Sequence, residues 1–510
     1  MYRTRPTSRV PSLAVACLLL GACHCNSNGG GSLTVDSPTV VAASTVAELG
    51  LVPFDADRED LVGPAEHSAQ YGMRPEIVVQ PDGTSLDVLV TDHADPMHPR
   101  AFLLRLDAQS GDYVVSRAWE MPFLDRTIGF ARDEAGDYYL ATAVDEGASI
   151  TKTYPSNSAY RHGIVYVYKV GADGTKRFVV DLDVARHAFQ RDCEQIINPM
   201  VASSGRLAVA GGQVALVHGI NTQPDSNGTR HQKALTTTLD STTGSILATS
   251  SIWVSHSFDE RLVPDGDGIL EMHLGDAYPR SFPLTRIPDG DSYSLFRIKG
   301  NTGDNNTRSR LGGVAPIAGG TVGYLALFAT ERSTGIDALD PDLGKIAGSR
   351  ELGLVRVMRD FTAHEPKDGV YLDPALPDTQ AIESGGTPYT NHLRFLTDYT
   401  GSTSNVAHAE RPKLVALGSN RYLVLWERWE NDGNTTPHVV YKGTWAMVID
   451  DSGSVLVAAQ KIGDHHLHRG DDAFALGNGA AWVSGDSMGH ALFVNLVSGT
   501  DLTYTRITVE

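Results

Sequence analysis

The chain has 510 residues, of which 41% are apolar, and its 42 basic and 61 acidic residues give a formal net charge of −19. This acidic balance opposes binding to nucleic acid or anionic membranes through net charge. Four cysteines exclude a disulfide framework, although a single bridge between Cys25 and Cys193 stays open. A chain of this length has enough apolar residues to be held together by a hydrophobic core.

The N-terminal segment has the order of features of an export signal. Three arginines precede residue 10, an apolar run covers residues 10–20, and Leu-Gly-Ala-Cys occupies residues 20–23. A basic start, a short apolar run and small residues are typical of a signal peptide, and the run is too short to span a bilayer. Residues 20–23 resemble the lipobox of bacterial lipoproteins, which implies removal of residues 1–22 and a palmitate-type lipid anchor on Cys23. An ordinary secretory signal with an incidental Cys23 is the alternative, and either interpretation exports the chain.

The segment after the signal changes composition at about residue 50. Residues 23–50 begin with a polar, glycine-rich stretch that does not bury apolar surface, and they predict a flexible tether. From residue 51 to residue 510, short runs of Val, Ile, Leu, Tyr and Thr recur between Gly, Asp, Asn and Ser. Such runs are typical of β-strands, and helix signals are sparse. We therefore expect an all-β domain over residues 51–510.

One turn followed by one strand occurs seven times along this body. Its glycines lie 52 to 69 residues apart, except for one step of 98 residues, and they are Gly83, Gly136, Gly205, Gly268, Gly320, Gly418 and Gly479. A second turn, seen as Leu-Asp-x-x-x-Gly at residues 106–111 and 239–244, follows the first. Two hairpins per repeat form a four-stranded sheet, and sheets repeated at this spacing predict a β-propeller. We expect seven blades.

The step of 98 residues has two interpretations. Residues 359–399 are polar and contain prolines, which predicts one blade that carries a long insertion loop. A degenerate eighth blade is the alternative. Long loops on a rigid scaffold often carry function, so the insertion is a candidate lid or partner contact, with surface decoration as the plainer interpretation.

The Leu-Asp-x-x-x-Gly turn resembles that of quinoprotein-like and related bacterial propellers, including the propeller lipoprotein of the outer-membrane protein assembly machinery. This resemblance implies the propeller fold and offers a scaffold role in an outer-membrane complex. The six tryptophans do not recur at one place in each blade. No quinone or other cofactor is therefore expected.

Arginine recurs just before the predicted innermost strands, at Arg74, Arg126, Arg261, Arg310, Arg411 and Arg469. The entry loops of innermost strands ring one mouth of a propeller channel. Guanidinium groups converging there would attract an anion and bind carboxylate or phosphate with two hydrogen bonds. The alternative is that each arginine pairs with a neighbouring carboxylate and ties blades together.

A second group of residues offers a catalytic interpretation. His256, Asp259, His273 and Tyr278 are the densest set of reactive side chains, and with flanking arginines they suit a glycoside hydrolase or polysaccharide lyase. Polar ties between blades are the structural alternative. The Gly-x-Ser-x-Gly match around Ser487 lacks the helix and the later partners of a nucleophile elbow, so it predicts a hairpin turn.

Metal binding has weaker support. His466 and His468 lie two residues apart and project to one side of a strand or loop, where a nearby carboxylate would complete a site. No established ligand spacing accompanies them, so no metal is expected.

Together these features predict an exported, lipid-anchored protein of the bacterial cell envelope. Its propeller is expected to bind an anionic glycan or a protein at one mouth of the channel, with no nucleic-acid partner. An envelope glycoside hydrolase or polysaccharide lyase is one alternative. A scaffold in an outer-membrane complex is the other.

Overall fold

The computed structural model describes nineteen stretches of the chain. They are residues 36–58, 75–95, 100–122, 126–145, 151–153, 159–161, 163–182, 205–221, 232–253, 259–274, 280–288, 292–298, 310–331, 349–359, 380–384, 387–391, 394–399, 407–431 and 439–510. All of them belong to one compact unit, residues 35–510. In these stretches the elements are β-strands, and no helix has the length and apolar character needed to cross a membrane.

The first sheet has five antiparallel strands in the order β1-β5-β4-β3-β2. Its strands are β1 (Thr39–Val41), β2 (Ile77–Asp82), β3 (Ser85–Asp92), β4 (Arg100–Gln109) and β5 (Asp112–Glu120). β2 is the innermost strand. β1 adds to the outer edge, where Val40 lies opposite Trp119.

Four further sheets have four antiparallel strands each. The second sheet contains β6 (Arg126–Arg132), β7 (Tyr138–Asp145), β10 (Gly163–Val170) and β11 (Lys176–Asp181). The third contains β12 (Gly205–Ala210), β13 (Gln213–Asn221), β14 (Gln232–Asp240) and β15 (Ile246–Trp253). The fourth contains β16 (Glu260–Asp265), β17 (Gly268–His273), β18 (Arg280–Ile287) and β19 (Ser292–Ile298). The last contains β30 (Phe474–Leu476), β31 (Gly479–Asp486), β32 (Ala491–Ser498) and β33 (Tyr504–Thr508).

The remaining large sheet has eight strands and two antiparallel runs. The first run is β20 (Arg310–Ile317), β21 (Gly323–Glu331) and β22 (Arg350–Met358), with β25 (Arg394–Phe395) paired to β22. The second is β26 (Ala407–Gly418), β27 (Arg421–Asn431), β28 (Val439–Ile449) and β29 (Val455–Gly463). A parallel pairing of Arg350 with His408 joins the two runs.

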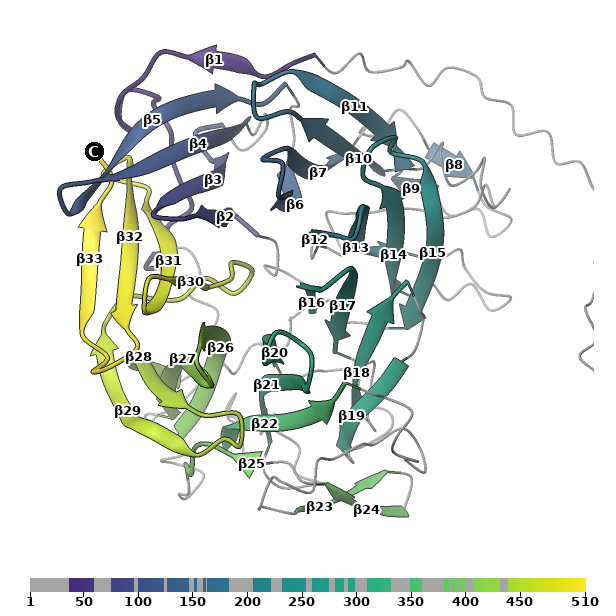
Figure 1. Cartoon of the computed structure of the whole chain (residues 1–510), viewed down its shortest axis with the longest axis vertical. Helices are drawn as coiled ribbons and strands as arrows, with labels where there is room; N and C mark the ends of the chain where they lie inside the picture. Colours follow the sequence, from purple (N-terminus) through teal and green to yellow (C-terminus); the bar gives the residue numbers. More distant parts are fainter. Residues whose placement is uncertain are drawn as a thin grey trace, which may run out of the picture. The chain divides into compact units, whose positions relative to one another are not determined.

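The sheets stand around a central channel, with β2, β6, β12, β16, β20, β26 and β30 innermost (Figure 1). Neighbours in this series contact one another, and β30 contacts β2, so the series closes on itself. The predicted all-β propeller is confirmed. The predicted count of seven or eight blades is not confirmed. Five separate sheets form blades in the described residues, and the Arg350–His408 pairing merges the other two runs of strands into one sheet.

The hydrophobic core lies between neighbouring blades. In one interface Leu103 and Trp119 of the first sheet pack against Phe130 and Tyr138 of the second. In another, Leu270 packs with residues of β21 and β22. Alternate residues of each strand point to opposite faces, so each sheet buries one face against the blade before it and one against the blade after it.

The N-terminal part of the body begins before the predicted boundary at residue 51. Residues 39–50, expected in the tether, pair through β1 with β5 and bury Val46 and Leu49. These side chains belong to the same cluster as Val494 of β32 and Val509 near the C-terminus. Apolar residues in the second half of the predicted tether therefore anchor it between the first and last blades.

One predicted turn lies elsewhere. Gly205 begins the innermost strand β12 and faces His218 of β13, so it is not in a hairpin turn. The turn is made by Gly211 and Gly212, whose φ angles of 54° and 76° lie in the left-handed region that glycine adopts without strain. The turn lies about six residues later than predicted. Because Arg206 was expected in the turn, it was not among the arginines predicted at the channel.

The predicted insertion and a shorter excursion from the second sheet are described in part. In the insertion at 359–399, β23 (Gln380–Ser384) pairs with β24 (Thr387–Asn391), and the segment's end supplies β25 to the edge of β22. In the shorter excursion, β8 (Thr151–Thr153) pairs with β9 (Ala159–Arg161). Residues 360–379 lie outside the described residues.

Candidate functional site in the central channel

The beginnings of the innermost strands meet at one end of the channel, here called the upper mouth. The backbone N–H groups of Glu76 and Ile77, at the start of β2, donate to Asp471 just before β30, at 2.7 and 3.1 Å. Arg206 of β12 donates to the carbonyl of Gly470 at 2.8 Å. The opposite end, where the same strands end at residues such as Asp82 and Asp265, is called the lower mouth.

Two of the predicted arginines are sealed inside the blades. Arg310 lies 3.5 Å from Glu410, which also pairs with Arg350. Arg411 lies 3.1 Å from Glu427 and donates to the carbonyl of Leu467 at 3.0 Å. Both side chains are almost fully buried, and neither lines the cavities found along the channel.

The other predicted arginines divide into three cases. Arg469 is buried, and its backbone carbonyl accepts a hydrogen bond from Lys413 at 3.2 Å. Arg126 begins β6, and its side chain lies outside the described part of the chain, as does all of Arg74. Arg261 alone of the six lines a cavity in the described residues.

Three cations, one predicted and two not, converge near the upper mouth. Arg261 donates to Asp259 at 2.6 Å and to the carbonyl of Leu311 at 3.1 Å. Arg206 donates to the carbonyls of Gly205 and Gly470. Lys413 donates to the carbonyls of Arg469 and Asp471. Backbone carbonyls thus help to hold each cation in place, and Arg261 is in addition paired with Asp259.

Asp472 is the carboxylate that these cations share. Its oxygens lie 3.5 Å from Arg261 Nε and 3.6 Å from Arg206 Nε, beyond ordinary hydrogen-bond length, and its side chain is 54% exposed to the channel. Burial by itself would raise the pKa of Asp472, but Arg206, Arg261 and Lys413 together lower it. Asp472 is therefore ionised and only loosely held.

Lys413 is affected in the opposite sense. Burial, reinforced by the positive charges of Arg261 and Arg206, lowers the pKa of Lys413 to about 8, although Asp472 and Asp471 favour its charged form. Its charge is thus marginal at slightly alkaline pH, while both arginines stay charged. The upper mouth therefore holds three cations among the carboxylates of Asp259, Asp471 and Asp472, and Lys413 is the titratable one of the three cations.

Two cavities lie along the channel on either side of the segment that carries Asp472. The larger, about 340 Å³, is lined by Arg261, Lys413 and Asp472 at its charged end. The smaller, about 140 Å³, is lined by Arg206, Arg132 and the same Asp472. Both cavities reach Asp472, while Arg132, at the end of β6 and 3.1 Å from Asp82, lines the smaller cavity toward the lower mouth.

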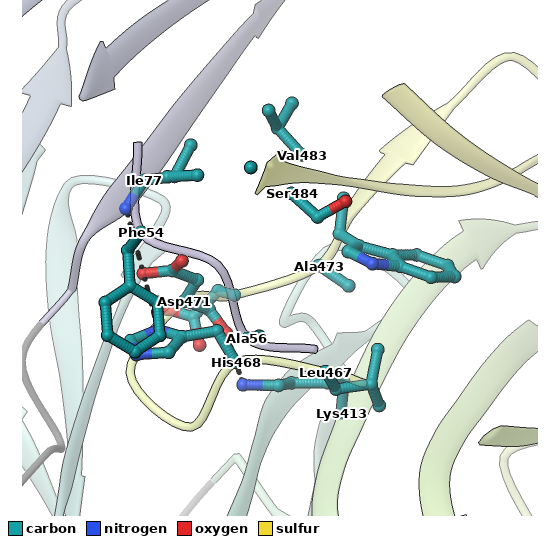
Figure 2. A pocket seen from close by; sticks show the side chains of 13 residues that line it. Phe54, Ala56, Ile77, Lys413, Leu467, His468, Asp471, Ala473, Val483 and Ser484 are labelled. Atoms are coloured by element: carbon teal, nitrogen blue, oxygen red, sulfur yellow. Dashed lines mark hydrogen bonds and ion pairs between the residues drawn. The ribbon is translucent and has the colours of Figure 1, made fainter. Parts of the chain in front are cut away.

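A network beside the channel holds this segment in position (Figure 2). His468 lies 3.0 Å from Asp471, and its ring centroid is 4.7 Å from that of Phe54. Asp471 in turn is hydrogen-bonded to the backbone nitrogen of Ile77. Phe54, which precedes β2, thereby meets His468, which follows β29, at the upper mouth. These contacts hold the segment that carries Asp472.

The metal candidates have separate partners. His466 Nδ1 lies 3.1 Å from Glu427, whereas His468 pairs with Asp471. No three His, Cys, Asp or Glu side chains are grouped to hold a metal ion within the ranges that the structure describes. Each histidine therefore contacts a different carboxylate within the fold.

Of the catalytic candidates the structure describes Asp259 and His273, and neither lines the two channel cavities. Asp259 accepts hydrogen bonds from Arg261 and from the backbone of Leu311, and His273 is fully buried, 3.3 Å from Glu271. His256 and Tyr278 lie outside the described residues, as does Cys23. Ser487 lies in the turn between β31 and β32 with its hydroxyl 3.4 Å from Asp55, in agreement with the expected hairpin.

Comparison with known proteins yields structural likeness only. No protein-family model matches the chain, and no curated protein matches it. The propeller domain of the trilobed protease of Pyrococcus furiosus is 8% identical, with a TM-score of 0.34, covering 84% of this chain and 97% of that one. An N10 neuraminidase-like protein of A/little yellow-shouldered bat/Guatemala/060/2010 is 9% identical, with a TM-score of 0.34, covering 74% and 94%. The acylaminoacyl peptidase of Pyrococcus horikoshii is 8% identical, with a TM-score of 0.37, covering 86% of this chain and 53% of that one.

Proposed function

We propose that this chain binds a small anionic ligand at the upper mouth of its channel, through Arg206, Arg261 and Lys413. The observation that carries the proposal is the pairing of three buried cations with one half-exposed carboxylate, Asp472, at distances too long for hydrogen bonds to its arginines. The neighbouring carboxylates are already engaged, Asp259 by Arg261 and Asp471 by His468 and β2. A ligand carboxylate would form the direct hydrogen bonds to Arg206 and Arg261 for which the carboxylate of Asp472 lies too far away.

The cations are arranged before any ligand arrives. Each is held by backbone carbonyls within a wall of low polarity, where charge interactions are stronger than in water. Little side-chain freedom remains to be lost on binding, which favours affinity. Arginine also matches the planar geometry of a carboxylate.

The size of the cavities narrows the predicted ligands. A volume of about 340 Å³ lies at the lower end of the roughly 300–1,000 Å³ typical of small-molecule sites. A folded protein does not enter such a space. The predicted classes, an anionic glycan or a protein, therefore reduce to a small anion or to one acidic group of a larger partner.

The proposal includes the features that rest on sequence. We infer that the chain is exported and anchored in the bacterial envelope through lipid on Cys23, because charge, apolar run, small residues and cysteine occur in the order of a lipobox. Replacing Cys23 with serine should move the protein from the membrane fraction to the soluble fraction. We also propose seven blades, with β20–β22 and β26–β29 as separate units joined by the Arg350–His408 pairing.

The binding proposal is tested by ligand-induced stabilisation of the full-length protein. Acetate, benzoate and glucuronate should raise the melting temperature, while the matched neutral amides should not. Lys413→Gln should remove most of the shift. Lys442→Gln, which changes an exposed lysine on the outer part of β28, is the matched control and should keep it.

Two results would overturn the proposal. One is the absence of any stabilisation by all three carboxylates up to millimolar concentration. The other is equal stabilisation of wild type and Lys413→Gln, which would locate the anion somewhere other than the upper mouth.

A further inference from the structure

The wall of the larger cavity changes character away from its charged end. Beyond Arg261, Lys413 and Asp472, Gln80 is the one polar side chain among the described residues that line it. The rest of the lining is apolar or glycine and includes Leu262, Val314, Ala315, Ala416, Phe474 and Ala475. A ligand that fills this cavity meets charge at one end and hydrocarbon along its length.

Three prolines make the lower part of this wall poor in hydrogen-bond donors. Pro81, Pro264 and Pro316 each lie on a different innermost strand and each lines the cavity. The innermost strand is an edge of its sheet, and proline is accepted there because its nitrogen faces away from the paired strand. A residue other than proline at these positions would present its backbone N–H group to the channel.

A sugar is poorly matched to such a wall. Its hydroxyl groups need both donors and acceptors, and buried hydroxyls without partners cost free energy. An alkyl chain has no such requirement and gains from leaving water. The distance from Arg261 to Pro264 along β16, three residues or about 10 Å at the usual rise per residue, leaves room for a chain below the charged head group.

We propose that the ligand is an amphiphilic monocarboxylate, a short fatty acid, whose carboxylate binds Arg261 and Lys413 and whose alkyl chain extends toward Pro81, Pro264 and Pro316. This inference rests on the proposed function, since it names the ligand class of the same site. It replaces the glycan of the sequence-based expectation with a ligand whose body is apolar.

Calorimetric titration of the full-length protein with hexanoate, octanoate, octanol and glucuronate tests the inference. Each buried methylene is worth about fourfold in affinity, so octanoate should bind on the order of tenfold tighter than hexanoate. Octanoate should also exceed both octanol, which lacks the charge, and glucuronate, which lacks the alkyl chain, by at least about tenfold.

A pair of tryptophan variants tests where the alkyl chain of the ligand binds. Ala475 is exposed within the cavity, so Ala475→Trp should fill it and abolish octanoate binding. Ala459 is exposed on the outer strand β29, so Ala459→Trp adds the same side chain away from the channel and should bind as wild type does. Melting curves check that both variants fold, and the chain-length series on the wild type needs neither variant.

The outcomes separate the two proposals. Glucuronate binding as tightly as octanoate, or no gain from hexanoate to octanoate, would overturn the fatty-acid inference and leave anion binding in place. Octanoate bound equally by wild type and a folded Ala475→Trp would also overturn it. If no carboxylate binds, or octanol binds as tightly as octanoate, the proposed anion site itself fails.

Discussion

At the lower mouth, Arg105, Arg117 and Arg132 surround Asp87, whereas at the upper mouth Arg206 and Arg261 face Asp472 across the channel. Asp87 is fully buried and lies 2.9 Å from Arg105, while the side chain of Asp472 is 54% exposed. The lower cluster spans the first two blades and is closed to solvent at its acidic centre. Arginine and aspartate thus form a closed contact between blades in one place and longer contacts to a half-exposed carboxylate in the other.

Two lysines repeat the contrast. Beside the turn between β6 and β7, Lys169 of β10 lies 3.1 Å from Asp137, and although burial opposes its charge, bonding to Tyr139 and Asp137 raises its pKa. At the upper mouth burial dominates and lowers the pKa of Lys413. The difference teaches that close contact with a carboxylate and a tyrosine keeps a partly buried lysine charged, whereas contacts with backbone carbonyls do not offset its burial.

The largest expected effect breaks the lower cluster. Asp87→Asn leaves three arginines without their central carboxylate, and removal of one partner of a buried ion pair costs about 3–5 kcal/mol of unfolding free energy. Urea unfolding measures the loss. Asp112→Asn, at the exposed turn after β4, is the control and should lie within about 0.5 kcal/mol of wild type. A loss below about 1 kcal/mol for Asp87→Asn would mean that solvent already compensates these arginines.

An intermediate effect is expected at the upper mouth, on binding instead of stability. Asp472→Asn should change the unfolding free energy by less than about 1 kcal/mol, because its side chain is half exposed and its arginine contacts are long. The same change removes a competing negative charge, so octanoate affinity should rise about tenfold, equivalent to about 1.4 kcal/mol. Titration calorimetry on both proteins checks this, and weaker binding by the variant would show that Asp472 assists the ligand.

The smallest expected effect is a pH dependence confined to the upper mouth. Because the pKa of Lys413 is lowered to about 8, its ammonium is protonated below that pH and neutral above it. Octanoate and both arginines keep their charges from pH 7 to pH 9, so affinity should fall by roughly threefold over this interval. Lys413→Gln should bind weakly with no pH dependence. A wild-type affinity that is constant from pH 7 to pH 9 would contradict the assigned role of Lys413.

Local sequence was sufficient for the architecture. Turn residues at regular spacing predicted the propeller, because glycine supplies positive φ wherever a hairpin reverses, as at Gly83 and Gly136. It misplaced one turn, since Gly205 and Gly211 are equally plausible before a short apolar run. That error concealed Arg206, which is the second residue of an innermost strand, as Arg261 is.

Arginines with similar sequence surroundings have different environments. Arg261 and Arg411 both lie near a carboxylate and near the start of an innermost strand, yet Arg261 lines the cavity and Arg411 is sealed against Glu427. Lys413, two residues after Arg411, is the side chain that reaches the channel. In a regular strand residues 411 and 413 would point to the same side, but the register of β26 shifts between Glu410 and Lys413 and Arg411 has a φ of 50°, so this irregularity separates the two side chains.

The sequence by itself determined the class of fold and the recurrence of cations near strand starts, because each depends on residue type and spacing along the chain. The tertiary structure decided which cations are neutralised and which share Asp472, because partners such as Arg206 and Asp472 are more than 250 positions apart in sequence. It also decided that three prolines from three blades line one cavity. Closure of the ring brings those positions together, and no local pattern records it.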